Sequence, residues 1–82
     1  MSHYVYILFS RSLDRYYVGC TGNLVSRLQR HNQHSKGYTG RVKDWELVYQ
    51  ELYESKDFAY KREREIKSWK SRLRIEELIH IK

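Results

Sequence analysis

Residues 3–20, HYVYILFSRSLDRYYVGC, decide the fold of this chain. The run from His3 to Phe9 is rich in β-branched and aromatic residues. Apolar side chains fall on both of its alternating faces, which predicts a central strand covered on both sides. A polar segment follows at 10–15, and Tyr16 to Cys20 resumes the strand pattern. The two runs therefore predict an antiparallel β-hairpin with a loop of about six residues.

A first helix is predicted directly after the hairpin. Capping side chains at 21–23, Thr-Gly-Asn, precede Leu24, Val25 and Leu28, whose spacing forms an apolar stripe. We expect this helix to end near His34, where a loop rich in glycine and cations begins. One face of the helix would then pack on the sheet.

The second half of the chain predicts one more strand and further helix. Residues 45–53, WELVYQELY, alternate as a strand does, and Ser55 is placed to cap the helix that follows. A break near Ser71 would separate this helix from a last turn or short helix. The apolar positions expected to pack are Phe58, Ala59, Ile66, Trp69, Leu73, Ile75, Leu78 and Ile79. The order β-β-α-β-α-α predicts an α/β (α+β) fold, a small three-stranded antiparallel sheet flanked by helices.

Length and composition favour one small domain with a polyanionic partner. With 82 residues there is room for one modest core, so 1–82 is expected to be a single domain. Sixteen Lys and Arg against ten Asp and Glu leave a formal charge of +6, which favours nucleic acid through counterion release. The single cysteine, Cys20, excludes an internal disulfide, and the Cys/His spacing of a zinc site is missing. Without a signal segment or a membrane-spanning apolar run, we expect a cytoplasmic protein.

Two short tyrosine motifs are the first candidates for a functional site. Tyr4-Val5-Tyr6 and Tyr17-Val18-Gly19 are separated by ten residues, which would put tyrosines on neighbouring strands. Packing alone explains most strand tyrosines, so a purely structural role stays open for each of them. Gly19 is more informative, because a glycine inside a strand often marks the close approach of a ligand such as phosphate.

Helical positions supply the remaining candidates. Arg27 and His31 are i, i+4 neighbours at the edge of the apolar stripe, so both can reach the sheet, although a solvated helix face explains them equally well. Glu63 borders the packed face of the long second helix, whereas Glu65 points elsewhere. An acid among so many cations commonly forms only helical ion pairs. A single carboxylate nevertheless suffices for Mg²⁺, which keeps most of its waters and takes further oxygens from phosphate.

Taken in order, these pieces resemble the GIY-YIG nuclease domain family, in particular its stand-alone, single-domain version. The resemblance covers nearly the whole chain and is carried by Tyr4-Val5-Tyr6, Tyr17-Val18-Gly19, the 21–32 helix with Arg27 and His31-Asn32, Gly37-Tyr38-Thr39, and 59–69 with Glu63. The chain has Tyr-Val-Tyr in place of Gly-Ile-Tyr, and Val18 in place of isoleucine. Neither departure removes a functional tyrosine, arginine or acid. The chain is also similar to the N-terminal nuclease domain of the excision-repair incision subunit, which suggests a role in DNA repair.

The resemblance implies an endonuclease that hydrolyses DNA phosphodiester bonds with one Mg²⁺ or Mn²⁺ and leaves 5′-phosphate and 3′-hydroxyl ends. Glu63 would bind the metal, and Arg27 would hold the scissile phosphate. Either Tyr17 or His31 would activate the attacking water, and Tyr6 would help to position water and phosphate. Further substrate contacts are expected from Gly19, Tyr38, Arg41 and Lys67.

Substrate choice and two other functions stay open at this level. Because 82 residues leave no room for a separate domain that reads base sequence, substrate shape is expected to guide cutting. One alternative is a non-catalytic nucleic-acid-binding module with the same fold, and another is an adaptor whose exposed aromatics bind a protein. The sequence does not separate DNA from RNA, and it does not define the oligomeric state or a targeting partner.

Overall fold

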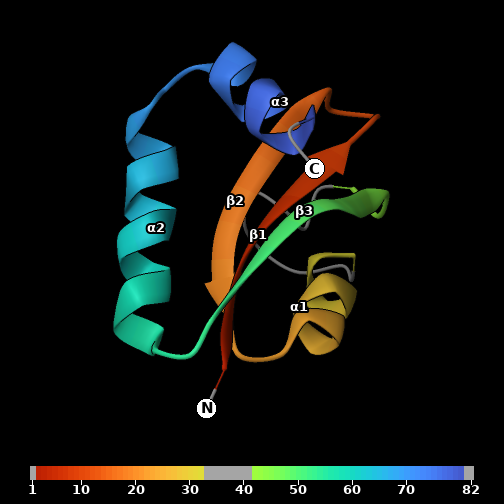
Figure 1. Cartoon of the computed structure of the whole chain (residues 1–82). Coiled ribbons are helices and arrows are strands. Elements are labelled where there is room, and N and C mark those ends of the chain that lie inside the picture. Colours follow the sequence, from red (N-terminus) through yellow and green to blue (C-terminus); the bar gives the residue numbers. More distant parts are fainter. Residues whose placement is uncertain (1, 33–41, 81–82) are drawn as a thin grey trace.

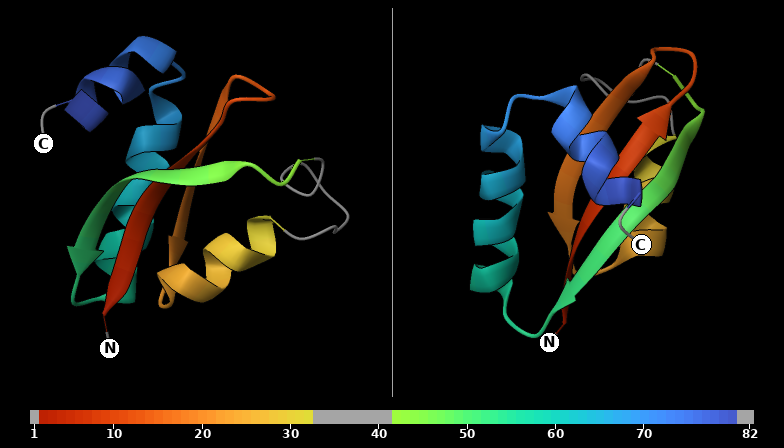
Figure 2. Two further views of the ribbon diagram at one scale, coloured as in Figure 1. Left: turned by 90° about the vertical axis from the view of Figure 1, so that its right-hand side faces the viewer. Right: turned by 45° about the horizontal axis from the view of Figure 1, so that its top comes forward.

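The computed structural model describes residues 2–32 and 42–80, which form a three-stranded sheet and three helices. The elements are β1 (His3–Ser10), β2 (Arg15–Thr21), α1 (Leu24–His31), β3 (Trp45–Tyr53), α2 (Lys56–Ser68) and α3 (Arg72–His80). The strands are antiparallel in the order β2-β1-β3, with α2 and α3 on one face and α1 on the other (Figure 1 and Figure 2). The predicted α+β fold and its element order are confirmed. No helix within the described residues is long and apolar enough to cross a membrane.

β1 is the central strand because both of its faces are covered. Val5 and Ile7 are buried on the α2 and α3 face, and Tyr6 and Leu8 are buried on the α1 face. Complete burial of each such aliphatic side chain contributes about 1.5–3 kcal/mol. The hairpin loop covers only residues 11–14, shorter than predicted, because the strands continue to Ser10 and Arg15.

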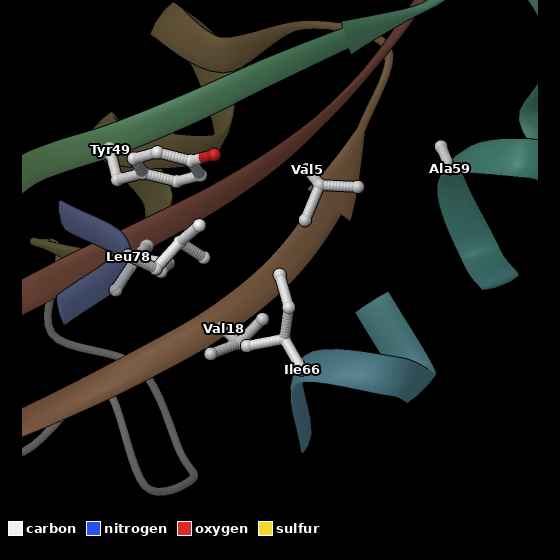
Figure 3. Close-up of a cluster of buried hydrophobic side chains, with 7 residues drawn as sticks. Val5, Val18, Tyr49, Ala59, Ile66 and Leu78 are labelled. Atoms are coloured by element: carbon white, nitrogen blue, oxygen red, sulfur yellow. The ribbon is translucent and has the colours of Figure 1, made fainter. Parts of the chain in front are cut away.

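The main core lies between the sheet and the two C-terminal helices. Figure 3 shows Val5 and Val18 of the strands facing Ala59 and Ile66 of α2, with Leu78 of α3 nearby. The first turn of α2 is capped as predicted, because the Ser55 hydroxyl accepts a hydrogen bond from the amide of Asp57 at 3.1 Å. The core is thus assembled from segments far apart in the chain.

Two residues predicted to pack in this core are instead exposed. The exposed fractions of Phe58 and Leu73 are 60% and 65%. Phe58 directly precedes the buried Ala59, and neighbouring helix positions point about 100° apart. Leu73 lies beyond Lys70, whose φ of 49° is left-handed and ends the path of α2. The helical break predicted near Ser71 is therefore confirmed, but it removes Leu73 from the α2 stripe.

α1 covers the other face of the sheet and is held at both ends. Asn23 caps its start by accepting a hydrogen bond from the amide of Ser26 at 3.1 Å. Leu24 and Leu28 pack inward, whereas Val25, expected in the same stripe, is 70% exposed because the adjacent position turns away from the sheet. The helix ends at His31 rather than near His34.

The residue after α1 ties this helix to the start of β3. The Asn32 side-chain amide donates a hydrogen bond to the Trp45 carbonyl at 3.1 Å, and the Trp45 amide donates to Asn32 Oδ1 at 2.8 Å. Both main-chain polar groups of Trp45 are thereby engaged by one side chain. This clamp fixes the C-terminal end of α1, and His31 with it, against the sheet.

Candidate active site

The candidate site lies along β2, an outer strand of the sheet, and is built first from two tyrosines. The strand register places Gly19 opposite Tyr6 and Tyr17 opposite Leu8. Because side chains alternate along strands, Tyr6 and Tyr17 emerge on the same face, the one that α1 covers. Their ring centroids lie 6.4 Å apart. The two predicted tyrosine motifs therefore meet as adjacent rings.

His31 completes an aromatic cluster with these tyrosines. The Tyr6 hydroxyl and His31 Nε2 share a buried hydrogen bond of 3.0 Å. The imidazole ring centroid is 4.7 Å from that of Tyr17. Trp45 closes the far side, with its ring 6.3 Å from Tyr17 in an edge-on arrangement. Sequence reasoning gave Trp45 and Asn32 no role, although an asparagine directly after the site histidine was a visible signal.

Burial sets the protonation states within the cluster. Burial lowers the pKa of His31 below its ordinary value, and the positive charges of Arg27 and Arg30 act in the same direction. Burial also strongly raises the pKa of Tyr6, and the neighbouring Tyr17 adds to this effect. At neutral pH, His31 is therefore uncharged and Tyr6 keeps its proton.

Glu63 and Lys67 reach the same strand from α2, on the opposite face. Lys67 Nζ donates to Glu63 Oε2 at 2.7 Å and lies 6.0 Å from the ring centre of Tyr17. After burial, the negative charge of Glu63 is the next cause that raises the pKa of Cys20, and it also raises that of Tyr6. The acid and its lysine partner thus border the tyrosine cluster across β2.

Arg27, a half-buried residue of α1, adds a permanent positive charge near the tyrosine cluster. Its charge acts to lower the pKa values of Tyr6, Cys20 and His31, in each case after the larger effect of burial. Arg27 and Glu63 therefore act on the same two residues of the sheet, Tyr6 and Cys20, from helices on opposite faces.

Gly19 is required by the packing of Tyr6. A Cβ atom at this position would lie 2.5 Å from Cζ of Tyr6, far inside any normal contact. The group that approaches this glycine in the structure is thus the Tyr6 ring, and a contact between Gly19 and phosphate stays a prediction. The other predicted substrate contacts, Tyr38 and Arg41, lie outside the described residues.

The acid at the site suits a hydrated divalent cation. Within the described residues there is no group of three or more His, Cys, Asp or Glu side chains that could hold a metal. Mg²⁺ does not need such a cage, because it keeps several waters and is commonly bound by one or two carboxylates together with substrate phosphate. The Lys67 side chain that now pairs with Glu63 is 51% exposed, so its ammonium is able to move away from the carboxylate. The donor set therefore fits Mg²⁺ or Mn²⁺.

Comparison with known proteins places the chain in a family. The family model of the GIY-YIG catalytic domain matches residues 2–76. A UPF0213 protein from Staphylococcus aureus strain Mu3 is 41% identical over 69 residues, which cover 83% of each chain. The solution NMR structure of the UPF0213 protein BH0048 from Bacillus halodurans superposes with a TM-score of 0.64 at 30% identity, covering 100% of this chain and 86% of that chain.

The chain therefore belongs to the GIY-YIG catalytic domain family. Membership supports a nuclease-type function, which implies a nucleic acid as the substrate. Nucleases of this family generally depend on a divalent metal. The names of the two UPF0213 relatives state no activity, so the functional conclusion rests on the catalytic-domain family and on the site.

Proposed function

We propose that this protein is a divalent-metal-dependent endonuclease that hydrolyses DNA phosphodiester bonds to 5′-phosphate and 3′-hydroxyl ends. The observation that carries the proposal is the convergence of Arg27 and Glu63, from helices on opposite faces, on the strand that holds Tyr17. Arg27 supplies a cation beside this strand, and Glu63 supplies an acid. Phosphodiester hydrolysis requires both, because charge must be stabilised on the phosphate and on the leaving oxygen.

Glu63 is the residue that would hold the metal. Bound there, Mg²⁺ or Mn²⁺ would neutralise the phosphate and stabilise the departing 3′ oxygen. Lys67 would release the carboxylate and turn its ammonium toward a neighbouring phosphate of the same strand. In this proposal Glu63 provides the carboxylate that binds the metal, and Lys67 provides a cation that can move from Glu63 to the substrate.

Arg27 binds the non-bridging oxygens of the scissile phosphate in this proposal. A guanidinium is always charged and offers a planar fork of donors, which matches phosphate better than an ammonium does. Half-burial lowers the local dielectric and strengthens the interaction with charge that grows during the reaction.

Tyr17 is the residue that we assign to the attacking water. It is more exposed than Tyr6 and His31, and the Lys67 ammonium lies 6.0 Å from its ring centre, so solvent water can reach this tyrosine beside a cation. The water oxygen attacks phosphorus and the bond from phosphorus to O3′ breaks. The Tyr17 oxygen takes a proton from the attacking water, and the departing O3′ takes one from solvent. Neutral His31, held by Tyr6, packs against the Tyr17 ring and keeps it in place.

His31 is the alternative base, and pH–rate profiles of cleavage separate the two assignments. If Tyr17 takes the proton, Tyr17→Phe loses most of the rate, whereas His31→Gln keeps the acid limb of the profile. Loss of that limb in His31→Gln, with Tyr17→Phe still active, would transfer the role to His31.

Substrate shape is proposed to guide cutting at a single strand. One site per chain makes a nick the expected product, and flaps, forks and junctions expose the strand more readily than a plain duplex does. The protein would work in the cytoplasm on DNA, and RNA is the alternative substrate that the same assay can include.

The test uses labelled single strands, duplexes, flaps, forks and four-way junctions with Mg²⁺, Mn²⁺ or a chelator. We expect cleavage by the wild type that is lost with chelator, in Glu63→Gln and in Arg27→Ala. Glu65→Gln is the matched control, because Glu65 lies on the same helix, is exposed and pairs with Arg62. Products should be rejoined by DNA ligase, which requires 5′-phosphate and 3′-hydroxyl ends. If nothing is cut while the wild type and Glu63→Gln bind DNA equally well, the protein is a binding module.

A further inference from the structure

One face of α2 carries a row of polar residues that leads away from the candidate site. Lys56, Tyr60, Glu63 and Lys67 follow one another at spacings of four, three and four. At 3.6 residues per turn these positions fall within about 60° of arc on the helix surface. The row runs beside the buried stripe of α2, so Glu63 and Lys67 of the site continue toward the start of the helix.

The far end of this row is an exposed pair of side chains. Lys56 Nζ lies 5.3 Å from the ring centre of Tyr60, and 43% of Tyr60 is exposed. The hydroxyls of Tyr16 and Tyr53 each donate to a glutamate. Within the described residues, the Tyr60 hydroxyl has no such partner. Its ring and hydroxyl are therefore available to a molecule in solution.

The charge of Lys56 reaches the site itself. Burial raises the pKa of Cys20, and the charge of Glu63 raises it further, while Lys56, Arg27 and Lys67 act to lower it. The charges of Lys56, Arg27 and Lys67 therefore all act on Cys20, as does the charge of Glu63. Lys56 thus adds to the positive potential that the other two cations create beside β2.

We propose that Lys56 and Tyr60 form a second contact for the nucleic-acid strand, with Lys56 on a backbone phosphate and the Tyr60 ring on an adjacent sugar or unstacked base. The strand would run along α2 from Glu63 toward the start of the helix. This inference rests on the proposed function, because it requires nucleic acid at Glu63. An ammonium beside an aromatic ring suits this ligand, since single strands are bound by cations along the backbone and by stacking on aromatic rings.

Helix geometry sets where on the substrate this contact falls. Lys56 and Glu63 are seven positions apart, which corresponds to about 10 Å along the helix axis. The axial rise of a duplex is about 3.4 Å per nucleotide, but neighbouring phosphates along one strand lie about 7 Å apart, so Lys56 would meet a phosphate about one to two nucleotides from the cut. Substrates that end closer to the cut on that side should not use the contact.

The test measures binding of labelled flap DNA by fluorescence anisotropy in the Glu63→Gln background, so that no substrate is consumed. We expect Lys56→Ala to weaken binding about fivefold and to reduce the salt slope by about one. Tyr60→Ala should weaken binding about fivefold or more, and Tyr60→Phe should restore it if the ring makes the contact. Flaps shortened to fewer than about two nucleotides on the relevant side of the cut should bind Lys56→Ala and its parent equally.

Two other residues of α2 provide matched controls. Lys61→Ala removes the same charge about 140° around the helix, and Phe58→Ala removes an exposed aromatic ring on the far side. Both should stay within about twofold of the parent protein. Equal effects of Lys56→Ala and Lys61→Ala would overturn the inference, because general charge would then explain binding.

The outcomes separate this inference from the proposed function. If the wild type cuts DNA and the Lys56 and Tyr60 variants match their controls, the second contact alone is wrong. If the wild type binds without cutting and Lys56→Ala still weakens binding, the contact stands and the catalytic proposal fails. If the wild type neither binds nor cuts any substrate, both are wrong.

Discussion

Glu51 and Glu63 are equally buried acids with opposite surroundings. Each side chain is 17% exposed, and each has a cation beside it. Glu51 accepts hydrogen bonds from Arg62 at 2.9 and 3.1 Å, from Tyr53 at 2.7 Å and from Tyr49. Glu63 accepts from Lys67 on the next turn of its own helix. Burial therefore does not distinguish the two acids, but their hydrogen-bonding partners do.

The two acids differ in how many of their acceptor positions are already filled by hydrogen-bond donors. Burial acts to raise the pKa of Glu51, but hydrogen bonds from Arg62, Tyr49 and Tyr53 outweigh it and lower the pKa overall. Burial and this carboxylate together raise the pKa of Tyr49 to about 12. A carboxylate offers about four acceptor positions, and the donors around Glu51 fill them. Among the described residues, the hydrogen bond that Glu63 accepts comes from Lys67, so most of its acceptor positions are open to a ligand.

The largest contrast between the two acids should appear in activity. We expect Glu63→Gln to lower the rate of DNA cleavage by at least about 10²–10³-fold, because the charge that holds the metal is lost. Glu51→Gln should stay within about twofold at a temperature where it is folded. Initial rates on a labelled flap substrate measure both. Similar losses in the two variants would mean that the carboxylates do not have separate roles.

For stability, we expect the Glu51 substitution to have the larger effect and the Glu63 substitution the smaller one. Glu51→Gln leaves Arg62 with only the exposed Glu65 as a charged partner and should lower the free energy of unfolding by about 2 kcal/mol, or roughly 10 °C in Tm. Glu63→Gln removes one ion pair with a half-exposed lysine and should cost less than about 0.5 kcal/mol. Urea unfolding followed by circular dichroism checks this. A Glu63 variant as unstable as the Glu51 variant would refute the distinction.

A smaller effect is expected where Tyr6 crosses Gly19. Gly19→Ala should destabilise the protein by about 1–2 kcal/mol, because the new methyl group would force the Tyr6 ring to move. The matched control is Gly22→Ala, whose Cβ would meet nothing closer than 3.7 Å, and it should be nearly neutral. Thermal melts and the NMR signals of Tyr6 and His31 report the two changes. Equal melting temperatures for both variants would contradict the close packing at Gly19.

The smallest predicted effect is the pH dependence that His31 adds to stability. Because the folded protein lowers the pKa of His31, the unfolded chain binds a proton first as the pH falls below the ordinary value near 6.5. The free energy of unfolding should therefore decrease on acidification in that range and be recovered above it. In His31→Gln this part of the slope should disappear. A slope unchanged by the substitution would assign the effect to other groups.

The apolar stripes of the helices show which packed positions could be predicted from the sequence. The packed positions Ala59 and Ile66 followed from spacing, because a helix repeats every 3.6 residues regardless of what it packs on. Phe58, Leu73 and Val25 were assigned to the core and are exposed. A run with apolar residues on several faces does not by itself indicate which face the sheet will cover. That choice depends on contacts with distant segments.

By itself, the sequence determined the central strand, the hairpin, the helix starts and the candidate residues, since each depends on neighbours within one or two turns or on alternation along a strand. Tertiary structure alone decided that Tyr6 meets His31 across 25 positions and that Asn32 binds Trp45 across 13. It also decided that Glu51, and not Glu63, has its carboxylate surrounded by hydrogen-bond donors. Because Arg62 of α2 provides two of the donors around Glu51, this difference between the two acids appears only in the packed chain.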